Sequence, residues 1–130
     1  MEKARILVVD DEVDVCNLLG NFLGMRNYSV ATALTVKDAI EAVKKERPAL
    51  VLLDVKLPDA SGLDALTAIK EIDPAIKVIM LTALDDNDTI EQSKLRGADD
   101  YISKPFNFGY LEGLILQKIS HLMRTKKEGR

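Results

Sequence analysis

The chain alternates five times between a short apolar run and a longer segment with helical spacing, and no other feature constrains its fold as strongly. The helical segments are amphipathic, and the last covers Phe108–Met123. Repeated strand-helix-strand units require parallel pairing with right-handed crossovers. We therefore predict an α/β fold, a doubly wound five-stranded parallel sheet with five helices on its two faces. The predicted strands are Arg5–Val9, Tyr28–Thr32, Leu50–Leu53, Ile76–Leu81 and Tyr101–Ser103.

The fourth predicted helix, Asp85–Arg96, differs from the others because it is mostly polar. Its main apolar residues are Ile90 and Leu95, and we expect these two to anchor it to the sheet. Asp85 is the expected N-cap. Because so few apolar side chains are available, this helix is predicted to be the most loosely held part of the fold.

Length and composition favour a single domain of residues 1–124, followed by a charged tail or the start of a linker at 125–130. The net charge of -3 gives no electrostatic reason for direct binding of nucleic acid. No apolar run approaches the roughly 18 residues of a membrane span, and the N-terminus lacks the order of a signal peptide. We expect a soluble, cytoplasmic protein without a membrane partner. The only cysteine, Cys16, is expected to be a packed core thiol.

Polar residues stand where the predicted strands end. Asp10 and Asp11 follow the first strand, and Asp54 follows the third. Thr82 follows the fourth strand and Lys104 the fifth. The carboxyl ends of parallel strands share one edge of the sheet, and open α/β sheets bind their ligands at this edge. We therefore expect these five side chains to converge.

The acids at this edge require compensation. Neighbouring strands lie about 4.8 Å apart, and two unit charges at roughly 4 Å repel by about 4 kcal/mol at an effective dielectric constant of 20. Hard carboxylate oxygens on an open rim suit Mg²⁺, and Lys104 can neutralise one carboxylate. The alternative is that Asp10 and Asp11 cap the first helix. Capping does not explain why Asp54, Thr82 and Lys104 converge from other strands.

Four blocks of the sequence resemble the receiver domain of the two-component response regulators. They are "ILVVDDE", "LVLLDVKLPDASGLD", "VIMLTA" and "GADDYISKPF", in the order and spacing of that family. The resemblance covers about residues 4–123. It implies a flavodoxin-like sheet with the strand order 2-1-3-4-5, as in the chemotaxis receiver.

The resemblance also implies a role for each polar residue of the site. Asp54 matches the phosphoacceptor, and Lys104 matches the lysine that pairs with the phosphoryl group. Asp10 and Asp11 match the acids that hold Mg²⁺ together with Asp54 and the backbone carbonyl of Lys56.

Two further residues match the switch of the family. Thr82 matches the hydroxyl that bonds a phosphoryl oxygen, and Tyr101 matches the aromatic residue that turns inward when Thr82 moves. Taken singly, Thr82 can equally be a β-branched residue at a strand end, and Tyr101 an edge-strand aromatic. Pro105 matches a proline preceded by a cis peptide bond.

By this resemblance the chain is a phosphorylation-controlled signalling switch rather than a classical enzyme. It would take a phosphoryl group from the phosphohistidine of a sensor histidine kinase or a histidine phosphotransfer protein, and lose it by slow autodephosphorylation. Phosphorylation would remodel the surface of helix four, strand five and helix five, and so control an output domain, a partner or a homodimer. The apolar fifth helix, with Phe108, Tyr110, Leu114 and Leu116, favours a hydrophobic contact there.

Two other functional classes stay open. An aspartyl-phosphate hydrolase similar to the haloacid dehalogenases needs a second acid two residues after the nucleophile, where this chain has Lys56. A pseudo-receiver would only bind partners, and it is disfavoured because no acid, hydroxyl or lysine of the site is missing.

Overall fold

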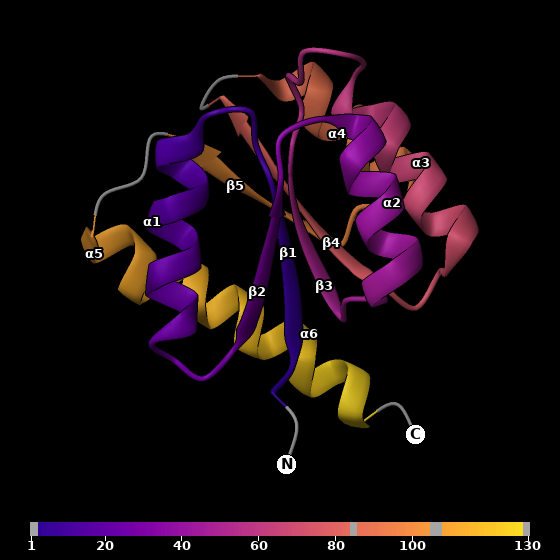
Figure 1. Ribbon diagram of the computed structural model, residues 1–130. Helices are drawn as coiled ribbons and strands as arrows, with labels where there is room; N and C mark the ends of the chain where they lie inside the picture. The colour runs from indigo at the N-terminus through magenta and orange to yellow at the C-terminus, as the bar shows by residue number, and fades with distance from the viewer. Residues whose placement is uncertain (1–2, 84–85, 105–107, 129–130) are drawn as a thin grey trace.

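Five parallel strands form one sheet in the computed structural model, which describes residues 3–83, 86–104 and 108–128. The order across the sheet is β2-β1-β3-β4-β5, so the predicted fold class and strand order are confirmed (Figure 1). Each strand begins and ends within two residues of its prediction. The strands are β1 (Arg5–Val9), β2 (Ser29–Ala33), β3 (Leu50–Asp54), β4 (Lys77–Ala83) and β5 (Asp100–Lys104).

Helices follow each strand, and the last of them is interrupted by a π-helical turn. The three final segments are contiguous and together form the predicted fifth helix, here called the C-terminal helix. It reaches Glu128 and so continues into the residues predicted as a tail. Among the described residues no helix is long and apolar enough to cross a membrane. The helical elements are α1 (Val13–Gly24), α2 (Val36–Glu46), α3 (Gly62–Ile72), α4 (Asn87–Leu95), α5 (Phe108–Tyr110), the π turn η1 (Leu111–Ile115) and α6 (Leu116–Glu128).

The core consists of two apolar layers, one on each face of the sheet. Side chains alternate between the faces along a strand. Ile6 and Val8 of β1 therefore pack with α1 and the C-terminal helix, whereas Leu7 and Val9 pack with α2 and α3. Figure 1 shows α1 and α6 on one side of the sheet and α2, α3 and α4 on the other. Because β1 and β3 are covered on both faces, residues 6–9 and 50–53 are all apolar.

The anchoring of α4 differs from the prediction. Ile90 is buried as expected, but Leu95 is 80% exposed, and Ser93 is the second buried residue. An α-helix turns by about 100° per residue. Ser93 therefore shares the face of Ile90, while Leu95, five residues on, points away. The N-cap is Asp86, whose side chain accepts from the Thr89 N–H; the predicted cap, one residue earlier, lies outside the described residues.

Candidate functional site

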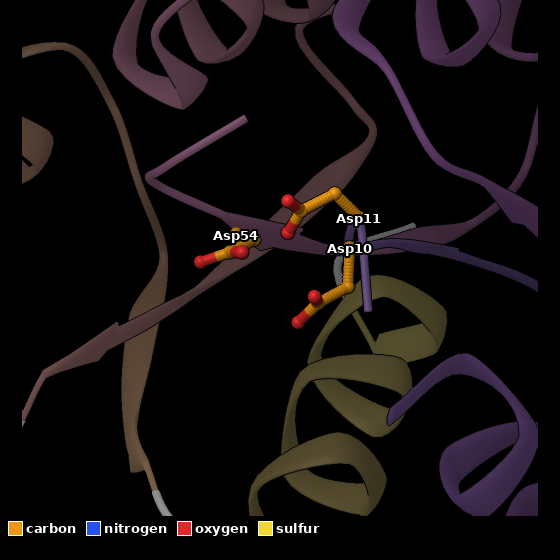
Figure 2. A group of neighbouring side chains, drawn as sticks. All are labelled: Asp10, Asp11 and Asp54. Carbon is orange, nitrogen blue, oxygen red and sulfur yellow. The ribbon is translucent and has the colours of Figure 1, made fainter. Parts of the chain in front are cut away.

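Three carboxylates meet at the carboxyl edge of the sheet. Asp54 closes β3, while Asp10 and Asp11 follow β1, which pairs with β3 directly. One carboxylate oxygen from each of the three lies within 4.8 Å of the others. Asp10 and Asp54 are buried and Asp11 is exposed, so the cluster opens to solvent on one side. Figure 2 shows the three side chains gathered at this edge, as the sequence predicted.

Local hydrogen bonds fix the position of Asp10. Its Oδ1 accepts from the backbone N–H of Glu12 at 2.9 Å, and its carbonyl accepts from the thiol of Cys16 at 3.3 Å. Cys16 is buried, as predicted, and burial raises the pKa of its thiol. With one oxygen Asp10 thus holds the turn that leads into α1, whose N-cap position is taken by Glu12 without a side-chain capping bond. The other carboxylate oxygen of Asp10 is left for the site.

Lys104 at the end of β5 reaches the acids from the opposite side. Its Nζ lies 2.6 Å from Asp10 Oδ2 and 3.4 Å from Asp54 Oδ2. It also lies 3.6 Å from Glu12 Oε1, an acid that was not among the predicted site residues although it directly follows the acidic pair. Burial lowers the pKa of Lys104, but the carboxylates of Asp10 and Asp54 outweigh burial and the net shift is upward. One ammonium group therefore forms ion pairs with three carboxylates.

The charge on Asp54 is not fully compensated by Lys104. Burial and the negative charge of Asp10 raise the pKa of Asp54 to about 6, although Lys104 and a backbone hydrogen bond from Lys56 act in the other direction. A group with such a shift is less stable as an anion than it would be in water. The remaining negative charge, on hard oxygen donors at an open rim, fits a divalent cation such as Mg²⁺.

Thr82 is buried near the end of β4, and its hydroxyl is unsatisfied. Its Oγ1 has no hydrogen-bond partner within the described part of the chain. Leaving a buried hydroxyl unpaired costs roughly 1 to 3 kcal/mol. Thr82 borders a cavity of about 700 Å³ that also contacts Asp54, Lys56 and Lys104. A polar group entering this cavity could give the hydroxyl a partner.

The loop after Asp54 is held by a glycine that the prediction of the site did not include. The N–H of Gly62 donates to the carbonyl of Val55 at 2.7 Å. A Cβ at Gly62 would overlap the carbonyl oxygen of Asp54, so only glycine fits. Lys56 pairs with Ser61 across the same loop. This close return of the chain fixes the backbone on which Asp54 and Lys56 stand.

Tyr101 lies on β5 and is half-buried, packed against the core layer of α2 and α3. The Nζ of Lys118 lies 5.7 Å from the centroid of its ring. The tyrosine is thus neither fully buried nor fully exposed. Pro105 and its predicted cis bond lie outside the described residues.

One family of known proteins matches most of the chain. The model of that family, described as response regulator receiver domain, matches residues 6–116. The chain is 37% identical over 124 residues to the probable transcriptional regulatory protein TcrX of Mycobacterium tuberculosis. The aligned region covers 95% of this chain and 52% of TcrX. It is 39% identical over 107 residues to sporulation initiation phosphotransferase F of Bacillus subtilis, covering 82% of this chain and 86% of that protein.

A solved structure agrees with these sequence matches. The signal receiver domain of a putative Luxo repressor protein from Vibrio parahaemolyticus superposes with a TM-score of 0.85 at 32% identity. The superposition covers 98% of this chain and 95% of that one. The chain therefore spans about half the length of TcrX but nearly all of the receiver domain from Vibrio.

Proposed function

Because the chain belongs to the family of response regulator receiver domains, we propose that it is a signalling switch controlled by phosphorylation of Asp54. The phosphoryl donor is the phosphohistidine of a sensor histidine kinase or a histidine phosphotransfer protein in the cytoplasm. Slow autodephosphorylation resets the switch. The observation that carries the proposal is the setting of Asp54, a carboxylate in an open cavity beside an ammonium group and an unpartnered buried hydroxyl.

The residues of the site supply what phosphoryl transfer needs. A carboxylate oxygen of Asp54 attacks phosphorus, the P–N bond to the donor imidazole breaks, and an acyl phosphate is left on the protein. Negative charge spreads over the three equatorial oxygens during transfer. Lys104, with its Nζ 3.4 Å from Asp54, holds positive charge where this charge develops. With a pKa of about 6, Asp54 is mostly ionised at neutral pH and remains a competent nucleophile.

Asp10, Asp11 and Asp54, with the backbone carbonyl of Lys56, are the proposed ligands of Mg²⁺. When bound, the ion supplies positive charge that offsets the repulsion among the acids and the charge of the transferred group. Titration with Mg²⁺ should raise the melting temperature of the unmodified protein. This stabilisation should be lost when Asp10→Asn and Asp11→Asn are combined; a double variant that keeps it contradicts these ligands.

The output of the switch is a change at α4, β5 and the C-terminal helix. Phosphorylation adds nearly two negative charges. We infer that the unpartnered hydroxyl of Thr82 donates to a phosphoryl oxygen and that Tyr101 moves further inward as a result. The altered surface then controls an output domain, a partner or a homodimer. In the C-terminal helix, Tyr110 and Leu116 pack on the chain's own core, whereas Leu114 is 38% exposed and open to such a contact. Leu95 of α4, 80% exposed, is open as well.

The test is the mass of the protein after incubation with Mg²⁺ and phosphoramidate. We expect a labile phosphoryl adduct that is absent from Asp54→Asn and present in the control Asp38→Asn, which removes an exposed acid of α2. An unmodified protein that forms no adduct would instead support a pseudo-receiver. Rapid hydrolysis of an added phosphate ester would support the hydrolase.

A further inference from the structure

The outer edge of β5, next to Lys104, is closed by side chains. β5 is the last strand of the sheet and, in the part of the chain that the structure describes, pairs only with β4. In a parallel pair, alternate residues direct their backbone N–H groups away from the neighbouring strand. On β5 these are Tyr101, whose N–H donates to Asp100 Oδ1 at 2.8 Å, and Ser103, whose N–H donates to the hydroxyl of Tyr110 at 3.2 Å. Exposed strand edges usually need such protection.

Both of these hydrogen bonds involve a residue that contacts, or belongs to, the C-terminal helix. Tyr110 is the last residue of α5, and Lys118 of α6 pairs with Asp100 Oδ1 at 2.9 Å. The π turn η1 lies between them. A π turn holds more residues per turn than an α-helix and is frequent at functional sites. The same C-terminal helix thus presents Tyr110 to β5 and keeps Ile115 and Ile119 fully buried.

We propose that Tyr110 is a positioning residue for Lys104, acting through the backbone of Ser103. The peptide group that joins Ser103 to Lys104 is part of the segment that Tyr110 holds. The long side chain of Lys104 must keep its Nζ 2.6 Å from Asp10 Oδ2 and 3.4 Å from Asp54 Oδ2, which a shift of its backbone would disturb. The ring of Tyr110 is itself partly buried against the core layer of α1, so its hydroxyl has a fixed place.

The proposal predicts a specific dependence on Lys104, and its kinetic part rests on the proposed function. Tyr110→Phe keeps the packed ring and removes the hydroxyl. It should slow phosphorylation by phosphoramidate about fivefold, which corresponds to one hydrogen bond of about 1 kcal/mol. In a Lys104→Ala background the same substitution should have no further effect on the rate. The matched control is Tyr28→Phe, which alters another partly buried tyrosine on the same core layer and should leave the rate unchanged.

An equal loss of rate in both backgrounds would overturn the proposal, because a purely structural role of Tyr110 predicts that result. A second pair of measurements does not need phosphorylation. In Tyr110→Phe the amide hydrogen of Ser103 should exchange about tenfold faster. The effects of Tyr110→Phe and Lys104→Ala on the urea midpoint should be less than additive. If the unmodified protein is not phosphorylated, the proposed function fails, while the urea measurements still decide on Tyr110: strictly additive effects of the two substitutions reject its positioning role.

Discussion

Helices α3 and α4 both connect neighbouring parallel strands, but they are held to the protein in different ways. α3 buries an apolar stripe in which Ala65, Leu66 and Ile69 have no exposed surface. α4 buries only Ile90 and Ser93. Buried apolar area stabilises a fold by about 25 cal/mol per Å². Because α3 buries more apolar side chains than α4, α3 is part of the core, whereas α4 packs on the surface of the core.

Polar contacts replace apolar burial in α4. Arg96, at its C-terminal end, donates to the carbonyl of Leu63 at 3.2 Å and pairs with Asp64 at 3.2 Å. Asp86, at the other end, accepts from the hydroxyl of Thr89 at 2.7 Å. Exposed contacts of this kind contribute about 1 kcal/mol or less each. α4 can therefore shift without opening the core, and it follows the strand that carries Thr82.

The largest expected difference between the two helices is in the cost of removing an apolar side chain. Leu66→Ala should lower the free energy of unfolding by about 3 to 5 kcal/mol, because it leaves a cavity in a fully buried layer. Ile90→Ala should cost about 2 kcal/mol, at the lower end for such changes, because the surroundings of α4 can relax. Urea denaturation measures both, with exposed Leu95→Ala as a neutral control. Equal costs for Leu66→Ala and Ile90→Ala would remove the distinction.

A mimic of the phosphoryl group should change the protection of α4 and leave that of α3 as it is. With Mg²⁺ and beryllofluoride, the amide exchange of α4, β5 and the C-terminal helix should change by about tenfold, which corresponds to about 1.4 kcal/mol in local stability. The amides of α3 should keep their protection. Asp54→Asn, which cannot form the adduct, is the control. Identical exchange at α4 with and without the mimic would contradict the proposed output surface.

Cutting the polar link between the helices should act on α4 alone. Arg96→Met removes the contacts to Leu63 and Asp64 but keeps most of the side-chain length. We expect amide exchange in α4 to become a few fold faster, because the contact is exposed and worth about 1 kcal/mol or less. The urea midpoint should hardly move. A large loss of global stability would mean that α4 is part of the core after all.

The smallest effect is a pH dependence confined to α4. The hydroxyl and N–H of Thr89 hold the pKa of the Asp86 carboxylate below its ordinary 3.8. A depressed folded-state pKa gives stability that is present above pH 3.8 and lost as the pH falls through the lower folded value. The cap of α3, Ser61, does not titrate. Below pH 3.8 α4 should lose protection before α3, and Asp86→Asn should reduce the difference between low and neutral pH.

Much of the fold follows from local patterns in the chain. The bounds of β1 were predicted without error, since an uninterrupted apolar run between polar residues has few other interpretations. β4 extends two residues beyond its prediction because Thr82 and Ala83 pair with β5, and such pairing leaves no sign in the sequence. The anchor of α4 was half wrong: composition gave two apolar residues, but only the position of the sheet decided that Leu95 faces solvent.

For the candidate site, the sequence predicted which residues come together but not their individual contacts. The convergence of Asp10, Asp11, Asp54, Thr82 and Lys104 follows from a topological rule, because parallel strands end at one edge. How Lys104 divides its contacts among the acids does not follow from that rule. Neither does the unpaired state of the Thr82 hydroxyl, which depends on every neighbour that packs around it.

The sequence by itself determined the parallel sheet, the edge at which the acids gather and the weak apolar face of the fourth helix, because each is a matter of periodicity or of strand ends. The tertiary structure alone decided that Gly62 must lack a side chain, that Arg96 ties α4 to α3, and that Tyr110 reaches Ser103. These contacts depend on distances and directions between elements, which arise only when the packed layers fix every element against the others.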